Sequence, residues 1–329
     1  MKLYITGNGF DLHHGLDTSY FSFGIFLQLH HKQSYDNLVE FVGFTNLPKD
    51  KLKLDEKEHP LWSEFERNLA GLDSQSVLDA FEDSLPNLGD PNFRDREWHT
   101  FEIEIQGVRK SLTDVLFKAF ELFISQVKYP MLGIDKKLQI SNDAFFINFN
   151  YTKTIEHYYG IRNNQILYIH GNASLPGEKL ILGHGVDPKN FEDEPVVPPT
   201  GLTYEELEQW RDEMGRNYNY AYESGKYELN RYFTNSFKNT DKVISENKAF
   251  LSQLNTVNEV IIVGHSLSEI DMPYFAAIKQ HIQPDSTWTA TWHNESDREK
   301  HFNALQSIGI ENPHIIQDCT LLVHPGCNS

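Results

Sequence analysis

The sequence predicts an α/β protein with a mostly parallel, Rossmann-like sheet and one large helical insertion. Short apolar runs typical of buried strands occur at residues 3–6, 145–149, 166–169 and 259–263. Helical patterns separate these runs, and this alternation builds parallel sheets. Residues 19–142 contain almost no strand pattern. We therefore predict an α/β domain formed by residues 1–18 and 143–329, with a helical insertion at residues 19–142.

The first predicted strand, over residues 3–6, runs directly into Gly7, Asn8 and Gly9. Glycines directly after a strand let the backbone turn tightly and let a phosphate or a ribose approach its N–H groups. The match to the dinucleotide-binding pattern GxGxxG is partial, because position 12 is leucine, so a plain tight turn is an equal alternative. Asp11 fits either a helix cap or an acceptor for a ribose hydroxyl.

The clearest element of the insertion is a helix over residues 94–128, in which apolar residues recur every three or four positions. This seam comprises Trp98, Phe101, Ile105, Val108, Leu112, Val115, Ala119, Phe123 and Val127. Such a stripe usually covers the core of its own chain. A seam of this length also suits a partner helix, so a homo-oligomer interface is the alternative.

In the middle of the chain, a strand over residues 145–149 ends in Asn150, and the strand over residues 166–169 ends in His170. A short helix is predicted between them. The two strands of such a βαβ unit are parallel, so their carboxyl ends lie at the same edge of the sheet, where ligands bind in open α/β sheets. We therefore expect Asn150 and His170 to face one pocket.

The region after His170 combines a strand, a long loop and helices. A strand is predicted over residues 180–182, and a proline-rich loop over residues 186–201 follows it. Long loops of this kind often act as lids or binding loops. Thr203 and Glu206 then form a capping box that begins a helix. Further helix is predicted over residues 218–254.

The last third returns to the α/β pattern, with strands predicted over residues 259–263, 287–292 and 320–323. A helix over residues 272–281 follows the first of these strands, and Asp271 is interpreted as its cap. A second capping box, formed by Ser296 and Glu299, begins another helix.

Composition narrows the class of protein. With 329 residues and 39% hydrophobic content, the chain can bury a sizeable core. It carries 29 basic and 47 acidic residues, a net charge of −18, so nucleic-acid binding is not expected. No run approaches the roughly 20 apolar residues that span a bilayer, and no secretory signal begins the chain, so we expect a cytoplasmic protein without membrane partners. Two cysteines exclude a disulfide framework and a four-cysteine zinc site.

The polar clusters all follow predicted strands, and we expect them to converge on one dinucleotide. The residues expected to bind it are Gly7, Asn8, Gly9, Phe10, Gly171, Gly264, His265, Ser266 and Leu267. The N-terminal glycine loop would hold the pyrophosphate, and Ser266 would hold the adenosine ribose. Asn150 and His170 would meet the other ribose. Each of these polar residues has a structural alternative, because strand-end side chains commonly satisfy nearby backbone groups.

Two sets of motifs carry a resemblance to known families. The opening GNGFDLHHGLDTSYFSF resembles the signature of the AbiH-type phage abortive-infection family, and the ordered set FNFNYTKTIE, YIHG, LGHG and VGHSLSEID is similar to the sirtuin-like NAD-binding domains of bacterial antiphage proteins. On this likeness, Asn150 stands at the strand-tip asparagine of sirtuins and His170 at the histidine of their catalytic His-Gly pair. The Gly-Ala-Gly and Gly-Thr-Ser-Leu turns correspond to Gly7, Gly9, Ser266 and Leu267.

Three positions depart from the sirtuin pattern. Asn8 replaces an alanine, Thr152 replaces an aspartate, and His265 replaces a threonine. Two cysteines cannot form the zinc ribbon of sirtuin deacetylases, which counts against protein deacetylation. The resemblance therefore implies an antiphage protein that binds or consumes NAD.

Hydrolysis of NAD needs few side chains, because nicotinamide leaves as a neutral base without a general acid. The enzyme has to stabilise an oxocarbenium-like transition state and place a water. His170 is the candidate base. Asn150 would position the water or hold the ribose, and Asp11 would supply a carboxylate near the developing positive charge.

The leading hypothesis is thus an NAD glycohydrolase of antiviral defence that needs no metal. Such an enzyme has to stay inactive until it is triggered, for example by a phage component, and we expect a homo-oligomer. One alternative is a sensor that binds a nucleotide without chemistry. Another is a metal-dependent hydrolase, in which the strand-end histidines His170, His184 and His265, with Asp187 or Asp271, would form a three-histidine or histidine-carboxylate site.

Overall fold

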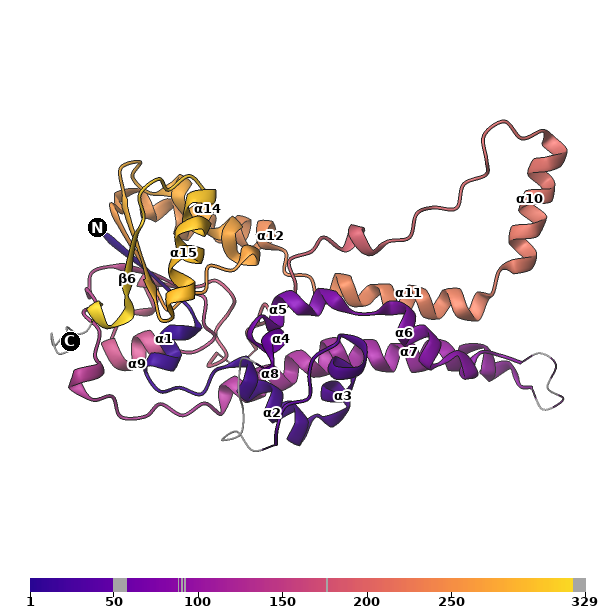
Figure 1. The fold of residues 1–329 in the computed structure, drawn as a ribbon, viewed down its shortest axis with the longest axis horizontal. Helices are drawn as coiled ribbons and strands as arrows, with labels where there is room; N and C mark the ends of the chain where they lie inside the picture. Colours follow the sequence, from indigo (N-terminus) through magenta and orange to yellow (C-terminus); the bar gives the residue numbers. More distant parts are fainter. Residues whose placement is uncertain (50–57, 88, 90, 92, 176, 322–329) are drawn as a thin grey trace.

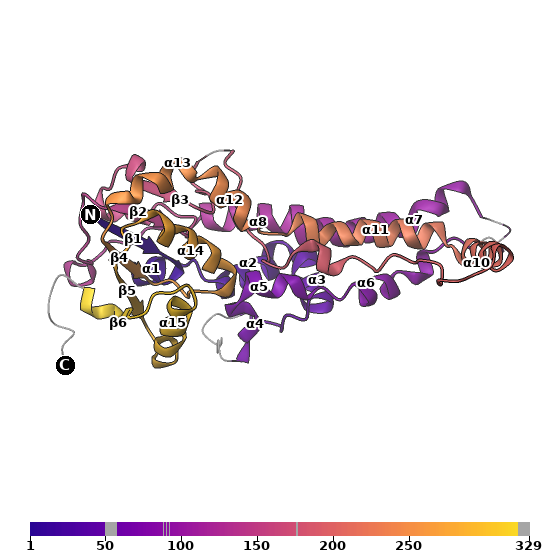
Figure 2. The ribbon, with the colours of Figure 1, turned by 90° about the horizontal axis from the view of Figure 1, so that it is seen from above.

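The structure is a computed structural model that describes residues 1–329 except 50–57, 88, 90, 92, 176 and 322–329. Figure 1 shows an α/β lobe, which contains the N-terminus, beside an elongated helical lobe. A thin arm that carries α10 (Tyr204–Asn217) stands away from both lobes. Seen from above in Figure 2, the helical lobe extends from one side of the sheet.

Six strands form one sheet in the order β3-β2-β1-β4-β5-β6. They are β1 (Lys2–Thr6), β2 (Phe145–Asn148), β3 (Ile166–Tyr168), β4 (Glu259–Val263), β5 (Thr287–Trp292) and β6 (His314–Gln317). All the pairings between them are parallel, which confirms the predicted fold class. The register sets Thr6 beside both Asn148 and Val263, so β1, β2 and β4 end together at one edge.

Alternation along the strands buries both faces of the sheet. Leu3 and Ile5 belong to an apolar cluster on one face, and Tyr4 and Phe146 belong to a second cluster on the other. Helices α12 (Thr240–Glu246), α13 (Lys248–Leu251), α14 (Met272–His281) and α15 (Glu295–Ser307) contribute to the first cluster. Helices α1 (Asn8–His13) and α9 (Thr154–Tyr159) contribute to the second.

The helical lobe has its own, largely aromatic core. Its helices are α2 (Tyr20–His30), α3 (Lys32–Phe41), α4 (Pro60–Ser63), α5 (Phe65–Asn68), α6 (Ser74–Ala80), α7 (Thr100–Lys110), α8 (Leu116–Ser125) and α11 (Tyr220–Asn235). Figures 1 and 2 show α11 alongside α7, although more than a hundred residues separate them in the sequence. They approach closely, since a Cβ atom added at Gly225 would lie 2.4 Å from Phe101 Cε1.

The predicted helix over residues 94–128 is confirmed for its greater part, and its seam is core. Phe101 and Leu112 are fully buried within the chain. A π-helical segment, Ser111–Val115, joins α7 to α8. Because this wider turn shifts the phase of the stripe, Val115 is 41% exposed and Leu116 is buried in its place. Whether the protein forms a homo-oligomer through another surface stays a prediction.

Several local predictions were wrong. Residues 180–182 form no strand; instead Leu182 packs in the core of the helical lobe. The last described strand is β6, residues 318–321 form a 3-10 helix, and positions 322 and 323 of the predicted strand lie outside the described residues. Asn294 occupies the N-cap position of α15, two residues before Ser296, so the predicted capping box of Ser296 and Glu299 does not begin this helix.

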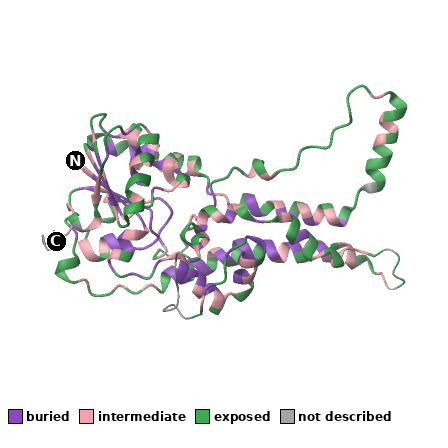
Figure 3. Ribbon diagram, in the orientation of Figure 1, coloured by how far each residue is buried: buried purple, intermediate pink, exposed green. Residues whose placement is uncertain are grey.

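Other local predictions are confirmed wholly or in part. The capping box of Thr203 and Glu206 begins α10 as predicted. Residues 218–254 are helical but are broken into α11, α12 and α13, because Asn219 and Asn239 each cap a new helix. The arm around α10 is largely exposed, as Figure 3 shows in green. No described helix combines the length and the apolar character needed to cross a membrane.

Candidate functional site

A cavity of about 670 Å³ lies at the carboxyl edge of the sheet, between the two lobes. The loops after β1, β2 and β4 line one side of it, and α2, α5 and α8 of the helical lobe line the other. The chain runs from β1 outward to β3 and then crosses back to β4 beside β1. The cavity therefore lies at the point where the strand order reverses, which is the usual ligand site of open α/β sheets.

The loops after β1 and β4 are bonded to each other. Gly7 N donates to Val263 O (3.1 Å), and Gly9 N donates to Gly264 O (2.7 Å). The contact leaves no room for side chains, because a Cβ atom at Gly7 would lie 2.6 Å from His265 Cα and one at Gly9 would lie 2.8 Å from Gly264 Cα. The glycines therefore allow the loops after β1 and β4 to cross in close contact. Their N–H groups are already used, so a phosphate would find no donor at Gly7 or Gly9 in this conformation.

Asn150 joins the third loop to this crossing. Its Nδ2 donates to Gly7 O (2.8 Å), and its backbone N–H donates to Asn148 Oδ1 (3.0 Å). Asn148 Oδ1 also accepts from Thr6 Oγ1 (2.8 Å), which ties the ends of β1 and β2 together. Part of the Asn150 amide thus holds the loops in place, while the residue still lines the cavity.

Three other predicted binding residues occupy different environments. Asn8 lines the cavity, and its Oδ1 accepts from Thr18 Oγ1 (2.7 Å). Phe10 is fully buried in the core beneath the sheet. Gly171 adopts φ 88° and packs near Lys179 O, and unlike its neighbour His170 it is not among the residues that line the cavity.

Asp11 is a buried carboxylate that lines the cavity from α1. It lies inside the first turn of the helix rather than at its cap, so the capping interpretation was wrong. Its Oδ2 accepts from Thr152 Oγ1 (2.6 Å), and its Oδ1 has no hydrogen-bond partner among the described residues. Burial raises the pKa of this carboxyl to about 6, although hydrogen bonds from Thr152 and Thr154 oppose the shift.

His170 lies in the cavity wall, almost completely buried, with the ring of Phe149 edge-on at a centroid distance of 5.2 Å. Burial lowers the pKa of its imidazole well below the usual value, and the nearby Lys238 charge lowers it further. Nε2 has no hydrogen-bond partner in the part of the chain that the structure describes. The ring is therefore neutral with Nε2 free of hydrogen bonds to described residues, and its lowered pKa makes it a weaker base than an exposed imidazole.

The turn after β4 is strained. Leu267 adopts φ 52°, in the left-handed region that side chains other than glycine rarely enter. Its buried side chain anchors the turn in the core, and its N–H donates to His265 Nδ1 (2.9 Å). Ser266, between them, is exposed and lines the cavity. Burial lowers the pKa of His265 to about 3, so this ring is neutral too.

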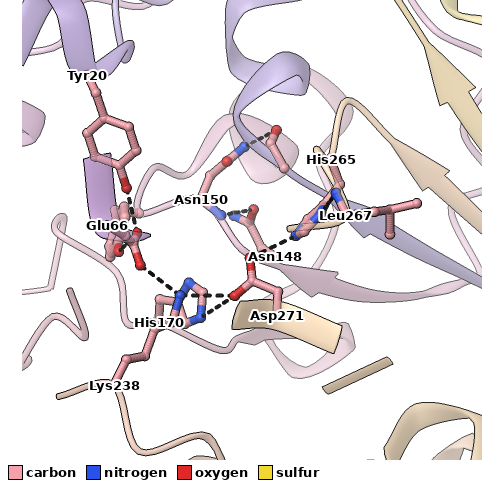
Figure 4. Close-up of polar contacts among 11 residues, drawn as sticks. Tyr20, Glu66, Asn148, Asn150, His170, Lys238, His265, Leu267 and Asp271 are labelled. Carbon is pink, nitrogen blue, oxygen red and sulfur yellow. Dashed lines mark hydrogen bonds and ion pairs between the residues drawn. The ribbon is translucent and has the colours of Figure 1, made fainter. Parts of the chain in front are cut away.

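The sequence pattern did not predict an ionic network at the cavity. Lys238 Nζ lies 2.9 Å from Glu66 Oε2 and 3.0 Å from Asp271 Oδ1, and its side chain is only 1% exposed (Figure 4). Glu66 Oε1 accepts from Tyr20 OH (2.5 Å), and Tyr151 OH lies 3.3 Å from the same oxygen. Burial lowers the pKa of Lys238, but the Asp271 and Glu66 carboxylates outweigh burial and raise it above its ordinary value.

The predicted cap at Asp271 is thus corrected. Asp271 occupies the N-cap position of α14 but makes no capping hydrogen bond within the described chain. Its carboxylate accepts from Lys238 instead. Asp271 belongs to the GHSLSEID motif, so the motif was a signal for it. Glu66 and Lys238 lie in segments without a strand pattern, where the sequence offered no signal.

A known protein family matches most of the chain. The family model for bacteriophage abortive infection AbiH matches residues 3–292, which include the helical lobe, strands β1 to β5 and the loops after β1, β2 and β4, whereas α15 and β6 lie beyond the match. The chain belongs to the AbiH family. Its predicted resemblance to AbiH is therefore confirmed, and the family's role is abortive infection, an antiphage defence. Searches of curated proteins and of solved structures gave no match.

Two of the three candidate metal-binding histidines of this AbiH protein, His170 and His265, lie together at the cavity, and His184 lies apart from them. His184 is fully buried beside Phe191 and Phe233 and is not among the residues that line the cavity, whereas His170 and His265 are. Within the described ranges, no group of three His, Cys, Asp or Glu side chains is arranged to hold a metal ion. The three-histidine metal site weighed from the sequence is therefore not formed.

Proposed function

We propose that the cavity of this AbiH protein binds NAD or a related nucleotide and that the protein hydrolyses NAD to nicotinamide and ADP-ribose. One observation carries the proposal: neutral His170 and Asp11 both line the cavity where the strand order of the sheet reverses. Among the described residues, neither His170 Nε2 nor Asp11 Oδ1 has a hydrogen-bond partner. The likeness of the strand-end motifs to sirtuin-like domains supports it.

The cavity suits a nucleotide in size and in lining. Its volume falls within the range of about 300–1,000 Å³ that is usual for ligand pockets. Phe120, Phe149 and Tyr151 provide aromatic surface for a base. Because the Gly7 and Gly9 N–H groups are engaged, the pyrophosphate would meet the exposed cations Arg67 and Lys300 at the cavity edge. It would compete there with the Glu64 carboxylate, to which both cations are ion-paired.

The residues support hydrolysis as follows. The bond between C1′ of the ribose and the nicotinamide nitrogen breaks, and its electron pair leaves with the neutral nicotinamide. The Asp11 carboxylate stabilises positive charge on the ribose ring. A water oxygen forms the new bond to C1′, and its proton passes to His170 Nε2. Asn150 holds the loop that carries this arrangement.

The proposal is tested by incubating purified protein with NAD and separating the products by chromatography. Nicotinamide and ADP-ribose should appear in equal amounts. An enzyme of this kind would deplete its own cell, so the assay is repeated with lysate from phage-infected cells as the trigger and across the oligomeric states that purification yields. No turnover under any of these conditions would sink the proposal.

A nucleotide sensor is the second candidate, because the engaged glycine N–H groups and the buried His170 fit a site that binds without turning over. It predicts saturable binding of NAD or ADP-ribose by calorimetry, with the ligand recovered intact. The same chromatography therefore separates the two functions.

A further inference from the structure

We propose that Asp271 is the positioning residue of the two cavity histidines, His170 and His265, and that Glu66 and Lys238 hold it in place. The site is then complete only when the helical lobe, which supplies Glu66, is docked on the α/β lobe. The kinetic part of this inference rests on the proposed NAD hydrolysis, whereas the geometric part does not.

The two carboxylate oxygens of Asp271 lie nearest to different histidines. Oδ1 lies 3.9 Å from His170 Nε2, and Oδ2 lies 3.7 Å from His265 Nε2. His265 Nδ1 accepts from Leu267 N–H, so the proton of its neutral ring resides on Nε2, on the side of Asp271. These separations slightly exceed hydrogen-bond length, as is common for catalytic contacts before substrate binds.

Asp271 is fixed from its other side by a buried cation. Lys238 follows α11, in the segment that leads into α12, and its ammonium bridges Asp271 to Glu66 on α5. The hydroxyl of Tyr20 donates a hydrogen bond to the other carboxylate oxygen of Glu66. A buried ammonium that loses one carboxylate is costly, so the two carboxylates hold each other in place through Lys238.

The arrangement differs from a purely structural ion pair. A structural aspartate at an N-cap would accept from backbone N–H groups, whereas Asp271 points at two rings and one ammonium. Once His170 Nε2 has taken a proton, the nearest carboxylate oxygen that the structure records for it is Asp271 Oδ1. Asp271 would then stabilise the imidazolium through Nε2, the nitrogen that carries the new proton, whereas the aspartate of a serine-protease triad bonds the opposite ring nitrogen.

The test uses protein labelled with ¹³C and ¹⁵N at histidine, so that ring signals of His170 and His265 are observed directly by NMR. Single replacements of each histidine by glutamine assign the signals. In Asp271→Asn, the ring signals of both histidines should shift. Glu66→Gln should shift the same two signals, because Lys238 then moves toward Asp271.

Glu228→Gln is the matched control. Glu228 is also a buried carboxylate, 3.3 Å from Arg109, with side-chain exposures of 8% and 5% for the two partners, but it lies in the helical lobe away from the cavity. It should leave the signals of His170 and His265 unchanged. Circular dichroism checks each fold. The inference is overturned if Asp271→Asn folds and leaves both ring signals unchanged. If Asp271→Asn does not fold, unchanged ring signals in folded Glu66→Gln overturn it.

Steady-state kinetics provide a second, independent measurement of the role of Asp271. With NAD as substrate, Asp271→Asn should lower kcat about 10- to 100-fold with little change in KM, because a residue that acts through His170 affects the chemical step. Asp271→Glu should recover part of the loss. If wild-type protein does not consume NAD, the proposed function fails while the NMR experiment still decides the role of Asp271.

Discussion

Burial acts in opposite directions on the pKa values of His170 and Asp11, because it opposes charge on both. It keeps the imidazole of His170 neutral and able to accept a proton. His170→Ala removes this base, so NAD turnover should fall by about 10²- to 10⁴-fold while nucleotide binding by calorimetry persists. His170→Gln, which better fills the buried site, controls for lost packing. A folded variant that consumes NAD at the wild-type rate would make this histidine structural.

At the same scale, Asp11 links stability to pH. Its folded pKa of about 6 lies above the ordinary value of 3.8, so the folded protein retains a proton that the unfolded chain has lost between these pH values. Stability from this group is therefore present below about pH 4 and declines as the pH rises toward 6. The total is roughly 3 kcal/mol, from about 1.4 kcal/mol per pKa unit.

Asp11→Asn should remove this dependence. Urea unfolding of both proteins at pH 4 to 7 measures it, since the free-energy difference between the variant and the wild type should grow in favour of Asn as the pH rises. A difference that stays constant across this window would contradict the buried, raised-pKa carboxyl.

At the scale of elements, the crossing of the loops after β1 and β4 is the tightest contact at the site. A Cβ atom at Gly264, where φ is 62°, would lie 2.2 Å from Phe10 N. Gly160 at the end of α9 has a similar φ of 66°, but no described atom beyond its neighbours lies within 4 Å of such a Cβ. Gly160→Ala should cost about 1 kcal/mol from backbone strain alone. Gly264→Ala should cost about 1–3 kcal/mol more, because the backbones have to separate. Urea midpoints that fall equally in both variants would rule out the steric account.

At the scale of the whole molecule, the exposed arm predicts a proteolysis pattern. Glu192 and Glu194 precede α10 in an exposed extended segment, while Glu228 on α11 is buried. A glutamate-specific protease should therefore cut first within residues 192–206. The two fragments should remain together on gel filtration, because α11 packs along α7 across the cut. Dissociation after a single cut in the arm would show that this packing does not hold the lobes.

The strands and their polar tips could be predicted because both signals are local. Residues 145–149 and 259–263 are mostly apolar runs, with Asn148 inside the first and Glu259 at the start of the second. Parallel pairing then brings the residues after them to one edge. Asn150, His170, His265 and Ser266 line the cavity for this reason. Residues 180–182 carry the same kind of run, yet they lie outside the sheet because Leu182 is buried by the helical lobe instead.

The sequence by itself therefore determined the parallel sheet, the edge at which the site lies and the AbiH family to which the chain belongs. Only the tertiary structure decided what completes the site. Glu66 and Lys238 are 172 positions apart, and Lys238 and Asp271 are 33 apart. No periodicity links them, because their contact depends on how the helical lobe docks against the strand ends. The Lys238 ammonium becomes buried between two carboxylates only when the helical lobe packs against the strand ends. The residues next to Lys238 in the sequence do not specify this contact.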